Sequence, residues 1–295
     1  MQPIDAVRAM LKDLVGGPDT PFMTRRAQAA QFAAAFVKPD DIEIEARQLG
    51  SVPVEWITPH GAAAAPVFFH LHGGGYVLGN PAGSRAFTTE FARVAACRVV
   101  SIDYRLAPEH PFPAAVDDAV AAYRALLASG CAPGEIAVGG ESAGGGLAVA
   151  MLLAAKRAGL PMPASLALIS PWTDMRCTAP SFETKADFDP LLTRRSLKEM
   201  ADAYMATCDP GDFRASPLLG DLEGLPPMLI HVGSEEVLLD DSRGLASAAK
   251  AQGVAVTLEE WPDMIHVWHM FHPVLPQGAD ALRIMAAFVR GHWKS

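Results

Sequence analysis

The chain has 295 residues, half of them hydrophobic and 19% charged, a composition typical of a compact globular protein rather than a disordered one. Its formal net charge of -9 argues against a general affinity for phosphate backbones, so we do not expect nucleic acid as a partner. No stretch approaches the length of a membrane span, and charged residues interrupt residues 1–16, so we expect a cytoplasmic protein without a membrane span.

Residues 1–38 are expected to form N-terminal cap helices. Apolar residues recur there at helical spacing, in two pieces that Gly16-Gly17-Pro18 separates. Residues 42–49 and 52–57 then alternate apolar with polar side chains around Gly50-Ser51, which predicts an antiparallel pair of strands.

Continuous apolar runs follow, as is typical of strands buried on both faces. They lie at residues 67–71, 99–102, 136–138, 166–169 and 228–232. Helical patterns alternate with these runs at residues 86–96, 114–127, 146–157 and 241–252, and a strand at 254–261 and a helix at 278–292 close the chain. This alternation predicts an α/β fold with a mostly parallel central sheet flanked by helices.

One connection, between Ser170 and Met228, is too long for a simple crossover. It contains a helical pattern at residues 196–207, and we expect a cap insertion at about residues 172–215 within a core of residues 39–295. Together with the N-terminal helices, this insertion would cover the end of the sheet at which ligands bind in α/β folds.

The first candidate functional residue is Ser142, in Gly140-Glu141-Ser142-Ala143-Gly144, between a strand and a helix. A serine on a sharp strand-to-helix bend points its hydroxyl away from the sheet and needs glycines on both sides for clearance. The pattern alone is weak, because glycine turns without chemistry share it. Its position between strand and helix makes Ser142 a candidate nucleophile.

A glycine run follows the strand at residues 67–71 directly, in His72-Gly73-Gly74-Gly75-Tyr76. Such a run frees backbone N–H groups to face a ligand oxygen, and acyl transfer passes through an oxyanion that fixed donors stabilise. We expect the N–H groups of Gly73, Gly74 and Ala143 to be these donors. The alternative is a flexible glycine loop without a function.

The candidate base is His266, which follows the last strand and precedes the closing helix. An imidazole can take the proton of a serine hydroxyl, and the order serine, acid, histidine is typical of a nucleophile-elbow fold. His269 and His272 follow at a spacing that zinc sites also use. A zinc site needs a further ligand and an activating carboxylate in reach, so we expect neither a metal nor a cofactor.

The candidate acid lies in residues 233–242, after the strand at 228–232. Four carboxylates occur there, on Glu235, Glu236, Asp240 and Asp241. Asp240 and Asp241 precede a helical pattern and are expected to cap it. Glu235 and Glu236 lie in the loop, where either side chain could reach the imidazole.

The four cysteines, Cys97, Cys131, Cys177 and Cys208, are widely scattered and form no Cys-x-x-Cys pair. We therefore expect free thiols rather than a disulfide framework.

Over nearly its whole length the chain resembles bacterial members of the hormone-sensitive lipase family of α/β-hydrolase esterases. The resemblance rests on His72-Gly73-Gly74-Gly75, on Asp-Tyr-Arg-Leu-Ala-Pro-Glu at residues 103–109, on residues 140–144 and on His266. It implies the α/β-hydrolase fold with a helical cap, and hydrolysis of esters with short to medium acyl chains. The family's acid motif begins with aspartate; residues 236–241 fit it with glutamate in first place, so the resemblance favours Glu236.

The resemblance also implies supporting roles. His72, Asp103, Tyr104 and Arg105 would hold the glycine loop. Glu141 would anchor this loop beside the oxyanion hole, the alternative being a solvated turn residue. Phe22, Met23 and Tyr76 are candidates for the substrate pocket, although apolar residues at helical spacing are more often plain packing. Relatives often dimerise through the edge strand, which here is residues 254–261, so a homodimer is expected.

Two other functions stay open. The same residues would serve an amide hydrolase, or a deacetylase that acts on an acylated metabolite. A non-catalytic ligand-binding protein can also use this fold, since some relatives have lost the catalytic histidine. Because Ser142, His266 and an acid are all present, we favour an enzyme that acts on a small-molecule ester.

Overall fold

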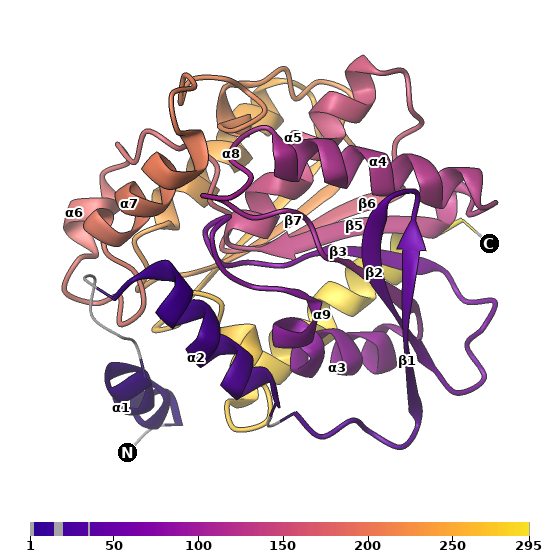
Figure 1. The fold of residues 1–295 in the computed structure, drawn as a ribbon, viewed down its shortest axis with the longest axis horizontal. Coiled ribbons are helices and arrows are strands. Elements are labelled where there is room, and N and C mark those ends of the chain that lie inside the picture. Colours follow the sequence, from indigo (N-terminus) through magenta and orange to yellow (C-terminus); the bar gives the residue numbers. More distant parts are fainter. Residues whose placement is uncertain (1–2, 15–19, 35, 295) are drawn as a thin grey trace.

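A single sheet of eight strands organises the part of the chain that the computed structural model describes, residues 3–14, 20–34 and 36–294 (Figure 1). Residues 1–2, 15–19 and 35 of the predicted N-terminal cap lie outside the described residues. The strands are β1 (Ile42–Leu49), β2 (Val52–Pro59), β3 (Val67–Leu71), β4 (Arg98–Ile102), β5 (Ile136–Glu141), β6 (Ser165–Ile169), β7 (Met228–Gly233) and β8 (Val256–Trp261). Their order is β1-β2-β4-β3-β5-β6-β7-β8; β1 with β2 and β2 with β4 pair antiparallel, and the other neighbours pair parallel.

Helices cover both faces of the sheet (Figure 1). One face carries α4 (Ala114–Ala128), α5 (Ala143–Arg157) and α8 (Leu239–Ala251), and the other carries α3 (Arg85–Ala95) and α9 (Pro276–His292). Four further helices gather at one end of the sheet: α1 (Pro3–Leu14), α2 (Phe22–Ala34), α6 (Ser181–Thr184) and α7 (Arg194–Met205). Four short 3-10 turns are η1 (Pro81–Ser84), η2 (Pro133–Glu135), η3 (Pro217–Leu219) and η4 (Trp268–Phe271).

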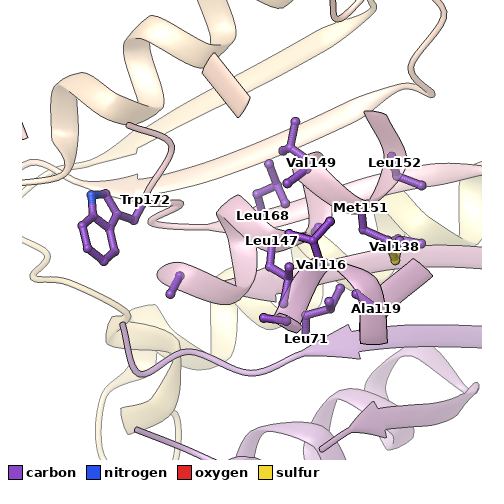
Figure 2. Close-up of a cluster of buried hydrophobic side chains, with 14 of the residues drawn as sticks. Leu71, Val116, Ala119, Val138, Leu147, Val149, Met151, Leu152, Leu168 and Trp172 are labelled. Carbon is purple, nitrogen blue, oxygen red and sulfur yellow. The ribbon is translucent and has the colours of Figure 1, made fainter. Parts of the chain in front are cut away.

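The core is split by the sheet into two apolar layers, because successive strand residues face opposite sides. On β3, Phe69 and Leu71 join the layer under α4 and α5, whereas Phe68 joins the layer under α3 and α9. Figure 2 shows the first layer around α5, where Leu147 and Met151 lie among side chains of β5 and α4. Both faces of the central strands are therefore buried, which explains their continuous apolar runs.

The predicted α/β class is confirmed, and the predicted strands and helices occur in the predicted order. Several boundaries differ from the predicted ranges by one to three residues. The largest difference at the start of a helix is in α5, which begins at Ala143, three residues earlier than the helical pattern indicated. The glycines at its start are helical because they pack against neighbouring backbone; a Cβ on Gly146 would lie 2.0 Å from the carbonyl oxygen of Trp172. Glycine disfavours a helix locally, but this close packing requires it.

The two edges of the sheet are β1 and β8, so β8 is an edge strand as expected. The homodimer through this edge stays a prediction. Among the described residues, no helix has both the length and the apolar character needed to cross a membrane.

Candidate active site

Ser142 occupies the bend between β5 and α5, with φ 55 and ψ -123. This is a backbone conformation that side-chain-bearing residues rarely adopt, and it holds the serine at the start of the helix. The flanking glycines are required because β3 passes close by. A Cβ on Gly140 would lie 2.4 Å from the carbonyl oxygen of Leu71, and one on Gly144 would lie 2.0 Å from it.

The bend brings Ser142 to His266 and Glu236, which come from the connections after β8 and β7. The Oγ of Ser142 lies 3.0 Å from Nε2 of His266, and Nδ1 of His266 lies 2.6 Å from Oε2 of Glu236. A carboxylate only accepts, so Nδ1–H donates to Glu236 and Nε2 is left to accept the serine hydroxyl. Glu236 is fully buried and His266 is 4% exposed.

Glu236 is held by its second oxygen as well. Oε1 accepts hydrogen bonds from the hydroxyl of Ser170 at 2.7 Å and from the N–H of Gly233 at 2.6 Å. Its neighbour Glu235 instead faces Lys185, with 3.5 Å between Oε1 and Nζ. The structure therefore brings Glu236, and not Glu235, to the imidazole.

The carboxylate of Glu236 also affects the pKa of the His266 imidazole. Burial alone would lower the pKa of His266, but the charge and hydrogen bond of Glu236, together with the charges of Asp189 and Glu141, raise that pKa above its usual value. The imidazole is thereby made a stronger proton acceptor.

The glycine loop lies beside Ser142, and Glu141 connects the two. The N–H of Gly73 donates a hydrogen bond to Oε1 of Glu141 at 2.7 Å. The sequence predicted that this N–H would face the substrate, but in the structure it already has an acceptor. Within the described part of the chain, the N–H groups of Gly74, Gly75 and Ala143 have no hydrogen-bond acceptor. Gly74 has φ 117, and a Cβ there would lie 2.3 Å from the carbonyl oxygen of Leu78, so only glycine fits.

His72 supports the loop as the sequence indicated. Its Nδ1–H donates to the carbonyl oxygen of Gly73 at 2.8 Å, and burial lowers the pKa of His72 to about 4, so the ring is neutral. Its ring stacks on Tyr104 with 4.1 Å between centroids, and the Tyr104 hydroxyl donates to the carbonyl oxygen of His72 at 2.8 Å. Asp103 differs from the expectation: its side chain is exposed and makes no hydrogen bond to the loop among those of the described residues. Tyr104, expected in the same role, does hold the loop, whereas Arg105 pairs with Asp118 instead.

The expected capping role of Asp240 and Asp241 is wrong. Helix α8 begins at Leu239, so both lie inside its first turn, and Asp240 pairs with Arg243. Asp241 is buried, and its Oδ1 accepts the N–H of Thr173 at 2.9 Å. It thus fixes the loop after β6, and burial raises the pKa of Asp241 to about 7. No local pattern could reveal a partner that is 68 residues away.

A second buried carboxylate was also missed. Asp189, in the predicted cap insertion, is 8% exposed. Its Oδ1 accepts the N–H groups of Leu191 and Leu192, both at 2.9 Å, and its Oδ2 accepts the N–H of Val237 at 3.0 Å. Because Val237 follows Glu236, this side chain joins the insertion to the loop that carries the acid.

The predicted pocket residues lie in three different environments. Tyr76 is fully buried, and its ring stacks on Tyr204 of α7 with 3.9 Å between centroids. Phe22 is half-buried against the larger core layer, and Met23 is 64% exposed. The two histidines at metal-site spacing hydrogen-bond elsewhere, His269 to His231 at 2.9 Å and His272 to a backbone carbonyl at 3.2 Å.

Comparison with known proteins agrees with this fold. Residues 68–270 match a family model described as the alpha/beta hydrolase fold. An acetyl-hydrolase of Streptomyces hygroscopicus is 48% identical over 265 residues, which cover 90% of this chain and 87% of that protein. An esterase from the bacterial hormone-sensitive lipase family has a crystal structure 44% identical to the chain, with TM-score 0.96 over 99% of this chain and 98% of that one. A structure of EstE5 soaked with p-nitrophenyl butyrate is 45% identical, with TM-score 0.94 and 99% of each chain covered. The chain therefore belongs to the bacterial hormone-sensitive lipase family of α/β-hydrolase esterases.

Proposed function

We propose that the chain hydrolyses carboxylic esters of small molecules, with Ser142 as nucleophile, His266 as base and Glu236 as the acid of a triad. The observation that carries the proposal is the continuous chain of contacts from Ser142 Oγ to His266, at 3.0 Å, and from His266 to Glu236, at 2.6 Å. A serine hydroxyl is a poor nucleophile until a base in hydrogen-bond reach removes its proton.

In this mechanism Ser142 attacks the ester carbonyl while His266 takes the hydroxyl proton. Glu236 keeps the imidazole in the tautomer that accepts at Nε2 and stabilises its charged form. The alcohol leaves with the proton from His266, and the acyl group stays on Ser142. A water molecule, deprotonated by the same histidine, then attacks the acyl-enzyme and releases the acid.

The negative oxygen of each tetrahedral intermediate needs donors fixed in advance. We assign this role to the N–H groups of Gly74, Gly75 and Ala143, which have no other acceptor among the described residues. The N–H of Gly73 would have to give up its bond to Glu141 first. We therefore assign Gly73 to anchoring the loop instead.

The substrate is proposed to carry a short to medium acyl chain. Support comes from the relative named acetyl-hydrolase and from the related structure that was soaked with p-nitrophenyl butyrate. The ring pair of Tyr76 and Tyr204 and the side chain of Met200, which a Cβ on Gly75 would meet at 2.2 Å, fill the space beside the glycine loop. Phe22 and Met23 on α2 remain proposed pocket residues; Phe22 packs against the larger core layer and Met23 is exposed.

The decisive experiment is Ser142→Ala, assayed with p-nitrophenyl acetate, butyrate, decanoate and palmitate. We expect loss of at least about a thousandfold in kcat with an unchanged unfolding temperature, and a wild-type preference for acetate or butyrate. A serine-directed fluorophosphonate should label the wild type and leave the variant unlabelled. Wild-type turnover by Ser142→Ala would refute the nucleophile, and an unlabelled, inactive wild type would point to a ligand-binding protein.

A further inference from the structure

One buried histidine close to the site takes no part in the mechanism above. His70 lies on β3, is fully buried, and has both ring nitrogens in hydrogen bonds. Its Nδ1 lies 2.9 Å from the Oγ of Ser101, and its Nε2 lies 2.8 Å from Oε2 of Glu141. The rings of Phe68 and Phe87 surround it. A polar side chain in such an apolar layer is costly unless its partners are fixed, so its bonds specify one arrangement.

The sheet register places these partners. His70 pairs with Ser101 on β4 and with Gly139 on β5, so it sits between the two strands. Gly139 has no side chain to fill this space, and a Cβ there would meet Phe68 at 2.4 Å. Glu141, two residues further along β5, then reaches back over the end of the sheet to the imidazole.

The carboxylate of Glu141 is shared between two donors. Burial favours its neutral form, but His70 and the N–H of Gly73 outweigh burial and hold the pKa of Glu141 below its usual range. An ionised carboxylate only accepts, so Nε2–H of His70 donates to one oxygen while Gly73 donates to the other. The hydroxyl of Ser84 lies 3.4 Å from the same oxygen as Gly73.

These bonds form a continuous path from the middle of the sheet to the glycine loop. Glu141 directly precedes Ser142, and a Cβ on Gly73 would lie 3.1 Å from the backbone oxygen of Glu141, so the bend and the loop touch. We propose that His70, oriented by Ser101, is a positioning residue: by fixing the rotamer of Glu141 it sets Gly73, and with it the N–H groups of Gly74 and Gly75, relative to Ser142. This inference rests on the proposed function.

The test compares His70→Leu, which removes both hydrogen bonds, with His70→Gln, whose amide can still donate to Glu141. Because His70 acts through Glu141 on the transition state, we expect His70→Leu to lower kcat for p-nitrophenyl butyrate about 10- to 100-fold with KM within about threefold. Affinity for a trifluoromethyl ketone, which forms a tetrahedral oxyanion on the serine, should fall in parallel with kcat. His70→Gln should recover most of both losses.

A control variant separates positioning from stability. Phe91→Leu alters the same apolar layer, because Phe91 packs on Phe68 and Phe87 but makes no hydrogen bond to Glu141. It should lower the unfolding temperature and leave kcat within about twofold of the wild type. If His70→Leu does not fold, Ser101→Ala, which removes only the outer bond, should lower kcat by a smaller factor with KM unchanged.

Wild-type kcat and ketone affinity in folded His70→Leu, or in Ser101→Ala where His70→Leu fails to fold, would overturn the inference. The inference would also be overturned if Phe91→Leu and His70→Leu proteins with the same unfolding temperature lost kcat to the same extent. The proposed function fails on a different result, namely an active Ser142→Ala, so the two failures are distinguishable.

Discussion

At the scale of single residues, the protonation state of His266 determines the pH range in which the proposed site is active. Burial opposes the charged imidazole, but Glu236, with smaller contributions from Asp189 and Glu141, raises the pKa of His266 above its usual value of 6.5. The base must be neutral to take the serine proton, so activity is lost as pH falls through this pKa. We expect kcat/KM for p-nitrophenyl butyrate to rise with pH through a midpoint above 6.5, and we expect Glu236→Gln to move this midpoint down while lowering kcat.

The measurement is a profile of kcat/KM between about pH 5 and 9 for both proteins. The matched control is Glu235→Gln, which removes the neighbouring carboxylate that faces Lys185 and should leave the midpoint in place. An equal shift in the two variants would mean that Glu236 acts only through general charge.

Residues at the site differ in how far the sequence could predict them. Ser142 and His266 were found because each stands at a fixed place relative to a strand and a helix. The choice of Glu236 over Glu235 needed the family motif, since two adjacent carboxylates in one loop look alike in a sequence. Asp189 and His70 were missed because their partners come from other elements, which only the folded chain brings together.

At the scale of elements, the junction of β5 and α5 carries the most restrictive packing. A Cβ on Gly144 would lie 2.0 Å from the carbonyl oxygen of Leu71 and 2.5 Å from that of His72, and backbone cannot move aside as a flexible side chain can. Gly144→Ala should therefore lower the free energy of unfolding by at least about 2 kcal/mol, measured by urea denaturation, and should reduce kcat because α5 begins beside Ser142.

The control for this prediction is Gly291→Ala near the end of α9, where a Cβ would meet nothing within 4 Å. Alanine favours a helix over glycine, so the change in unfolding free energy should stay within about 1 kcal/mol and should not be destabilising. A Gly144→Ala protein as stable as the wild type would contradict the packing described for this junction.

The elements themselves were well predicted, because period and length are local properties of the chain. Apolar runs gave the central strands, and strict alternation gave β1 and β2. The early start of α5 was not predicted, since its three glycines disfavour a helix and are accommodated only by contacts with β3 and the loop after β6.

At the scale of the whole molecule, segments from both halves of the chain meet on the loop that carries His266. Ile4, Val7 and Leu11 of α1 pack with Met264 and Ile265 in one apolar cluster. The guanidinium of Arg8 donates to the carbonyl oxygens of Phe188, at 2.8 Å, and Asp263, at 3.2 Å. The N-terminal helix thereby joins the segment after β6 to the histidine loop, and no single stretch of sequence indicates this arrangement.

Asp189 makes the second such connection, and its removal is our last prediction. Three backbone N–H groups point at its two oxygens, one of them from Val237, next to Glu236. Asparagine offers one oxygen, so Asp189→Asn turns an amide NH₂ toward N–H donors and leaves at least one of them unsatisfied, at a cost of about 1–3 kcal/mol. Urea denaturation should show this loss of stability, and an activity assay should show a lower kcat, because the loop that carries Glu236 loses its anchor.

The control is Asp187→Asn, which removes the same charge from an exposed position two residues away and should change neither quantity. Equal effects of the two substitutions would show that charge, and not the hydrogen bonds of Asp189, couples the insertion to the triad.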